Sequence, residues 1–206
     1  MLIISNLCYG GYFYKYMDQQ YNNPFIWCRV FYDSMRYLME HWEKINFKNF
    51  KVKLSKNPRN SYDVIVDGHV LINYPHYLLD LSAEKIIYDT NYDRSMHNYW
   101  IGDIRFKDME NYVSSQYQRR VERMLSIDEK PCFLIRDDEK YMGYPSKTKM
   151  GDIIECAKYK TLIFTEDKDL FSDNPNCLIR HIGNLWQTHP EIQIRQNLPE
   201  IKSFLL

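Results

Sequence analysis

The stretch Leu2-Ile3-Ile4-Ser5-Asn6-Leu7-Cys8-Tyr9-Gly10-Gly11 decides the fold of this chain. A short apolar run ends in Ser-Asn, a Gly-Gly pair follows, and an aromatic-rich segment extends from Tyr12 to Met17. This pattern predicts a buried first strand, a tight turn and a segment that leaves the sheet. In open α/β sheets, ligands bind at the turns that follow the carboxyl ends of such strands.

The Gly10-Gly11 pair favours a ligand at this turn, because a residue without Cβ lets the backbone approach a bulky group. If a helix begins here, its first N–H groups would suit a phosphate. The stretch lacks the third glycine of a dinucleotide fingerprint and the Gly-Lys-Ser/Thr of a P-loop. A plain strand and turn without a ligand is therefore the alternative.

The rest of the chain alternates between strand and helix patterns. Apolar spacing predicts helices from Asp33 or Ser34 to about Ile45, from about Asp108 to Leu125, and over 149–158. Apolar runs predict further strands, which comprise 85–89, 132–135, 161–165 and 177–180. The tail from Trp186 is interrupted by prolines and predicts at most a short terminal helix.

Asp67-Gly68 stands between the apolar runs Tyr62–Val66 and His69–Ile72, which predicts an antiparallel hairpin. Together these elements indicate an α/β fold: a Rossmann-like three-layer sandwich with a mixed, mostly parallel sheet and a β-hairpin insertion. We expect a single domain over residues 1–206, with a hairpin annex at about 50–90.

Composition restricts the classes of partner. The chain has 206 residues with 27 basic and 27 acidic side chains, and a nucleic-acid binder usually shows a basic excess, so we expect no nucleic-acid partner. It has neither an apolar run of roughly 18 residues nor a secretory signal pattern, so we expect a cytoplasmic protein without a membrane span. Aromatic residues make up 16% of the chain. Such a content is typical of a sugar-binding surface or of the edge of a core, and an AT-rich genome would also produce it.

The five cysteines are widely spaced and contain no Cys-x-x-Cys pair, which argues against a disulfide framework and structural zinc. Cys8 follows the first strand, where helix N–H groups lower a thiol pKa, so it is either a nucleophile or a small residue that fills the turn. The histidines form no zinc motif. His76 and His97 stand in polar surroundings and are either general bases or surface residues.

Arg136-Asp137-Asp138 follows a predicted strand. The carboxylates could hold a divalent metal ion, or Asp137 could accept a proton from an amine, and a solvated turn is the alternative. Arg119 and Arg123 share one face of a predicted helix, where they either grip phosphates or form a solvated face beside Glu122.

Several segments resemble an uncharacterised family of exopolysaccharide and capsule biosynthesis. They comprise Ile4-Ser5-Asn6-x-Cys8-x-Gly10-Gly11-x-x-Tyr14, Tyr21-Asn22-Asn23-Pro24-Phe25, Gly102-Asp103-Ile104, Tyr117 to Arg123, Phe133 to Asp138 and Ile163-Phe164-Thr165. The chain also resembles the amino-terminal domain of a viral amino-sugar N-acetyltransferase. The family usually has a His-Tyr pair after Gly-Asp-Ile, where this chain has Glu110-Asn111. The resemblance implies an α/β protein that acts on sugars and has its ligand site near the first turn.

We therefore predict an N-acetyltransferase that transfers acetyl from acetyl-CoA to a nucleotide-linked amino sugar, without a metal ion. The predicted catalytic residues are Cys8, Asp103, Asp137 and His76. The predicted substrate-binding residues are Ser5, Asn6, Gly10, Gly11, Tyr14, Tyr21, Asn23, Arg119 and Arg136, with Asn6 and the N–H groups around Gly10 and Gly11 as an oxyanion hole. A further catalytic domain in a longer gene product is left open.

Two alternatives remain at this point. One is a glycosyltransferase in which Asp137 and Asp138 hold a metal ion on the donor pyrophosphate, assisted by Arg119 or Arg136. The other is a non-catalytic glycan-binding domain in which aromatic side chains stack on sugars. Metal dependence separates the first alternative from acetyl transfer, and sugar binding without turnover identifies the second.

Overall fold

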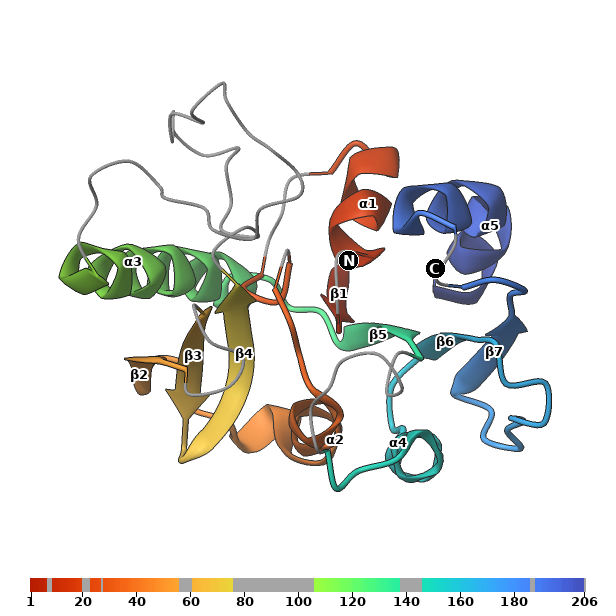
Figure 1. The fold of residues 1–206 in the computed structure, drawn as a ribbon, viewed down its shortest axis with the longest axis horizontal. Coiled ribbons are helices and arrows are strands. Elements are labelled where there is room, and N and C mark those ends of the chain that lie inside the picture. The colour runs from red at the N-terminus through yellow and green to blue at the C-terminus, as the bar shows by residue number, and fades with distance from the viewer. Residues whose placement is uncertain are drawn as a thin grey trace.

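The computed structural model describes residues 1–6, 9–19, 23–26, 28–55, 61–75, 106–137, 146–185 and 188–205. Its main feature is a four-stranded parallel sheet (Figure 1). In spatial order, the strands are β1 (Leu2–Ser5), β5 (Pro131–Arg136), β6 (Thr161–Thr165) and β7 (Cys177–His181). The opening stretch of the sequence therefore forms an edge strand that pairs with residues about 130 positions later in the chain.

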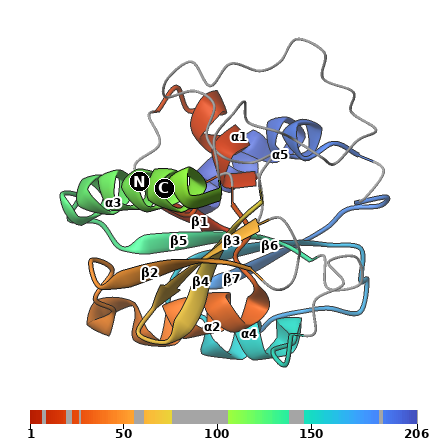
Figure 2. The same ribbon diagram turned by 60° about the vertical axis from the view of Figure 1, so that its left-hand side comes forward.

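Both faces of the parallel sheet are apolar because helices cover both. α1 (Tyr9–Tyr16) and α5 (Pro190–Leu205) lie on one face, and α2 (Tyr32–His41) and α4 (Met150–Cys156) lie on the other (Figure 2). Side chains alternate along each strand, so Ile3 and Leu134 join the core under α1 and α5, whereas Ile4 and Phe133 join the core under α2 and α4. The predicted three-layer α/β class is confirmed.

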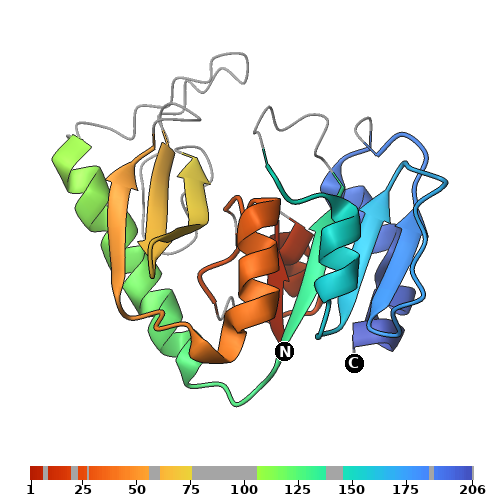
Figure 3. The same cartoon turned by 90° about the horizontal axis from the view of Figure 1, so that it is seen from below.

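A second, antiparallel sheet consists of β2 (Phe50–Leu54), β3 (Ser61–Val66) and β4 (His69–Pro75). The predicted hairpin is confirmed: Asp67 and Gly68 have φ angles of +51° and +84°, as a tight turn between twisted strands requires. The long helix α3 (Phe106–Leu125) packs on this sheet, where the rings of Phe50 and Tyr117 lie 4.6 Å apart (Figure 3).

The hairpin strands do not join the parallel sheet, contrary to the expectation of one mixed sheet. The reason lies at the free edge of β1, where side chains already form hydrogen bonds with the backbone of Ile3. Its N–H donates to Tyr14 Oη at 3.1 Å, and its carbonyl accepts from Asn23 Nδ2 at 3.0 Å. Arg29 pairs with Asn73 of β4 instead, so the chain around residue 29 lies alongside the second sheet.

Element lengths depart from prediction at the helix ends. α2 stops at His41 and is followed by the single 3₁₀ turn η1 (Trp42–Lys44). The terminal helix α5 has 16 residues and contains Pro199, because its buried face, which includes Ile194 and Ile201, packs on the sheet. The expected strand at 85–89 lies outside the described residues. Among the helices that the structure describes, none is both long and apolar enough to cross a bilayer.

Candidate functional site

The chain reverses its winding direction between β1 and β5, which are neighbours in the sheet. β1 leads into α1 on one face, whereas β5 is followed by α4 on the opposite face (Figure 1). Connections that leave in opposite directions open a crevice beyond the carboxyl ends of the two strands, and this switch point is where open α/β sheets hold ligands. Asn6 and Asp137 are the first residues beyond these two strand ends.

Asp137 is a half-buried acidic residue at this corner. Its carboxylate accepts a hydrogen bond on each oxygen: Tyr32 Oη donates to Oδ1 at 3.0 Å, and Thr165 Oγ1 donates to Oδ2 at 2.7 Å. Its backbone N–H donates to the Phe164 carbonyl at 2.8 Å. Asp137 is half-buried, and each carboxylate oxygen can accept a second bond, so the group is held in place and can still receive a proton or a donor from a ligand.

Three separate elements place these groups. Tyr32 belongs to the first turn of α2, Thr165 ends β6, and Asp137 follows β5. Thr165 Oγ1 also accepts from the Asp167 N–H at 3.0 Å, which orients the hydroxyl proton toward Asp137. Sequence reasoning identified Asp137 but missed both hydroxyls. Thr165 could have been identified, because it is a polar residue at the end of the apolar run 161–165. Nothing in the local sequence pattern pointed to Tyr32.

Asn6 and Arg136 lie at the same corner but are buried, 1% and 5% exposed. The Asn6 side chain exchanges two hydrogen bonds with the Arg136 backbone. The Arg136 guanidinium donates to the Leu185 carbonyl at 2.7 Å and lies over the Tyr9 ring. These contacts give both residues a structural role, and the amide group predicted for an oxyanion hole is already engaged.

Gly10, the first glycine of the pair, acts in packing. A Cβ on Gly10 would lie 3.0 Å from Ser5 Cβ and 3.0 Å from Ile26 Cδ1, so this glycine lets α1 approach β1 closely. Gly10, Gly11 and Ser5 are all buried. The structure therefore supplies a packing reason for the motif that the sequence associated with ligand approach.

Tyr14 and Asn23 are both fully buried. Tyr14 Oη donates to the Met1 carbonyl at 2.8 Å, and Asn23 Oδ1 accepts from the Phe25 N–H at 2.9 Å. Together with their bonds to Ile3, these contacts protect the free edge of β1 from pairing with other strands. In this conformation neither side chain is accessible to a substrate.

Arg119 is not brought to the switch point. It belongs to α3, which packs on the second sheet, and it donates to Gln116 Oε1 at 2.7 Å. On the same helix, the buried Arg120 donates to the Ile26 carbonyl at 2.9 Å, a role that sequence reasoning missed. The predicted site residues Cys8, Tyr21, His76 and Asp103 lie outside the described residues, as does Asp138.

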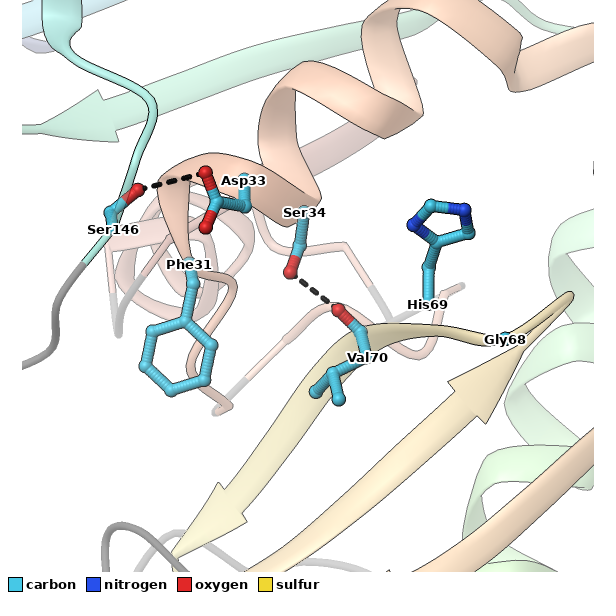
Figure 4. Close-up of a pocket in the computed structure, with 7 residues that line it drawn as sticks. All are labelled: Phe31, Asp33, Ser34, Gly68, His69, Val70 and Ser146. Atoms are coloured by element: carbon cyan, nitrogen blue, oxygen red, sulfur yellow. Dashed lines mark hydrogen bonds between the residues drawn. The ribbon is translucent and has the colours of Figure 1, made fainter.

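A pocket of about 310 Å³ is lined by residues that include Phe31 and Asp33, the two neighbours of Tyr32 in the chain (Figure 4). It opens between the start of α2, the β3–β4 turn and the segment before α4. Its lining residues are Phe31, Asp33, Ser34, Gly68, His69, Val70 and Ser146. Sequence reasoning treated Asp33 and Ser34 only as helix caps, because the residues that complete the pocket are distant in the chain.

The thiols that the structure describes are poor nucleophiles. Cys28 is fully buried, and burial raises its pKa far above the ordinary range. Burial also raises the pKa of Cys156 and of Cys177 to about 11 and raises that of Cys132. Within the described residues, no group of three or more His, Cys, Asp or Glu side chains is placed to hold a metal ion.

Comparison of the chain with models of protein families found no match, and comparison with curated protein sequences found none either. The resemblance to sugar-modifying proteins thus stays a prediction from motifs.

Proposed function

We propose that this protein is an acyltransferase that transfers acetyl from acetyl-CoA to the amino group of a nucleotide-linked amino sugar, and that Asp137 receives the amine proton. The observation that carries the proposal is the placement of Asp137 at the β1–β5 switch point, with Tyr32 and Thr165 donating to its two oxygens. The motif resemblance to sugar-modifying proteins supports the choice of substrate.

The proposed reaction replaces the C–S bond of the thioester by a C–N bond and moves one proton from nitrogen to sulfur. The amine nitrogen attacks the thioester carbonyl carbon, the N–C bond forms, and the C–S bond of acetyl-CoA breaks. Asp137 accepts the proton that the nitrogen loses, and that proton finally reaches the CoA thiolate, so the products are the amide and free CoA. In a covalent variant of this scheme, Cys8 first takes the acetyl group from the thioester and then passes it to the amine.

The test incubates the protein with acetyl-CoA and a panel of UDP- and dTDP-linked amino sugars and follows the products by mass spectrometry. We expect one acetyl group to be added to one member of the panel. Asp137→Asn should lower the rate about 10²–10⁴-fold, the usual contribution of a general base. Asp128→Asn is the matched control, because Asp128 is an exposed aspartate near the opposite end of the same strand.

Other outcomes separate the competing functions. Sugar transfer that depends on manganese, without acetylation, would replace the proposal by a glycosyltransferase. Sugar binding without any turnover would leave a glycan-binding domain. Full activity of Cys8→Ala would exclude the covalent scheme and leave direct transfer.

A further inference from the structure

We propose that the pocket beside α2 binds a single hexopyranose ring, with Asp33 accepting hydrogen bonds from the ring hydroxyls and with Phe31 and His69 contacting the ring itself. The choice of a sugar as the ligand rests on the proposed function. The residues that line the pocket indicate a ligand with hydroxyl groups and apolar faces. This subsite is formed by residues other than Asp137, Tyr32 and Thr165.

The two oxygens of Asp33 are used unequally. Oδ1 accepts from the Thr148 N–H at 2.9 Å, from Thr148 Oγ1 at 2.6 Å and from Ser146 Oγ at 3.1 Å. Oδ2 accepts only one long bond from a described residue, from the Lys147 N–H at 3.4 Å. One oxygen thus fixes the carboxylate in place, and the other has capacity for a ligand donor.

The charge of the pocket argues against phosphate. No Lys or Arg is among the lining residues that the structure describes, and Asp33 forms no ion pair with any of the described residues. Burial alone would raise the pKa of Asp33, but the bonds from Thr148, Ser146 and Lys147 outweigh it and hold the pKa below its ordinary value. An ionised carboxylate that accepts hydrogen bonds but forms no ion pair with a described residue repels a diphosphate and attracts hydroxyl donors.

Rings stand on two walls of the pocket. Phe31 precedes α2, and His69 begins β4 across the opening (Figure 4). The His69 imidazole stacks on Tyr37 at 3.8 Å between ring centroids and 17° between planes, which fixes its orientation. Ser34 lies between these walls and donates to the Val70 carbonyl at 2.5 Å, which ties α2 to β4. Aromatic walls and one carboxylate match a pyranose, which has apolar C–H faces and a rim of hydroxyls.

The size of the pocket is sufficient for a sugar ring. Its volume of about 310 Å³ lies within the roughly 300–1,000 Å³ range of ligand pockets, at the lower end. Tyr32 connects the pocket to the corner that holds Asp137. Its hydroxyl donates to Asp137, and the residues before and after it in the chain, Phe31 and Asp33, line the pocket.

The test titrates the isotopically labelled protein with methyl glycosides of glucose, galactose and N-acetylglucosamine and follows the amide signals of Gly68 and Val70 by NMR. Neither nucleotide nor acetyl-CoA is present. We expect saturable shifts with at least one glycoside. Asp33→Asn replaces the carboxylate by a neutral amide, so the atom that faces the ligand hydroxyl is either an NH₂ donor or a weaker acceptor. The affinity for the glycoside should fall about tenfold, as the loss of a charged hydrogen bond implies.

Asp67→Asn is the matched control, since Asp67 is an exposed aspartate in the adjacent turn and does not line the pocket. The Asp67→Asn variant should bind the glycoside with the same affinity as the unmodified protein. If Asp33→Asn does not fold, His69→Ala tests the same site from the exposed hairpin and should also weaken binding. The inference is overturned if no glycoside shifts these signals, if both variants bind as tightly as the unmodified protein, or if uridine alone occupies the pocket.

These results are distinguishable from failure of the proposed function. Glycoside binding without acetyl transfer would keep the subsite and reject the reaction. Acetyl transfer with unchanged activity in His69→Ala, and with no glycoside signal, would keep the reaction and reject the subsite.

Discussion

Asn6 and Arg136 exchange two hydrogen bonds across the junction of β1 and β5. The Arg136 N–H donates to Asn6 Oδ1 at 2.9 Å, and Asn6 Nδ2 donates to the Arg136 carbonyl at 2.6 Å. The amide side chain thus imitates a peptide group and extends the parallel ladder beyond Ser5, the last residue of β1. This contact fixes the end of β5, and with it the residue that follows, Asp137.

Replacement of Asn6 by alanine should therefore destabilise the protein. It removes the acceptor of the buried Arg136 N–H and the closer donor to the Arg136 carbonyl, which Tyr32 Oη also contacts at 3.5 Å, and this costs about 2–4 kcal/mol in the free energy of unfolding. Urea unfolding measures the change. Asn49→Ala is the control, because Asn49 is exposed, and it should stay within about 0.5 kcal/mol of the unmodified protein. Equal stabilities for the two variants would contradict the structural role of Asn6.

Gly10→Ala should also destabilise, although alanine favours a helix. The added methyl group would meet Ser5 Cβ and Ile26 Cδ1 at 3.0 Å, so α1 must move away from β1. We expect a loss of about 1–3 kcal/mol, the usual cost of overpacking. Gly151→Ala in α4 has no atom within 4 Å of the new Cβ and should be neutral or stabilise by up to about 1 kcal/mol. Thermal unfolding of both variants checks the opposite signs.

The stability contributed by Asp33 should depend on pH in a defined direction. Its pKa is lower in the folded protein, because hydrogen bonds from Thr148, Ser146 and Lys147 outweigh the opposing effect of burial. A lowered folded pKa means that this contribution is complete above the ordinary Asp value of about 3.9 and is lost as pH falls through the lower folded value.

Urea unfolding of the unmodified protein and Asp33→Asn between pH 6 and pH 2 tests this. The stability difference between the two should be constant at the upper end and shrink as the pH falls below about 4. A difference that stays constant over the whole range would show that the charge of Asp33 contributes nothing.

Alkylation should spare the described cysteines in the native protein at pH 7.5. Burial keeps Cys28 protonated and inaccessible and raises the pKa of Cys156 and of Cys177 to about 11, so their reactive thiolates are scarce. Iodoacetamide labelling followed by peptide mass mapping measures each site. Labelling of Cys156 and Cys177 should increase as the pH approaches 11, provided that the fold persists. Fast labelling of Cys28 at neutral pH would contradict its buried position.

The strands of the parallel sheet and of the hairpin were predictable because each contains a short apolar run, whereas β2 alternates apolar residues with lysines. Thr161–Thr165 and the hairpin around Asp67-Gly68 follow the predicted bounds closely. The separation into two sheets was not predictable, because it depends on Tyr14 and Asn23 using the free edge of β1, and both lie outside that strand in sequence. Helix α5 was underestimated because Pro199 is tolerated where Ile194 and Ile201 are buried against the sheet.

The sequence by itself determined the α/β class, the hairpin and the presence of an acidic residue at the end of β5, since these follow from local periodicity and turn chemistry. Only the tertiary structure decided which polar residues act together. Tyr32, Asp137 and Thr165 meet because three elements end or begin at one edge of the sheet, and Asp33 meets Thr148 for the same reason. Hydrogen bonds between residues that are distant in the chain leave no periodic trace in a sequence, so the partners of Asp137 and of Asp33 became visible only in the folded chain.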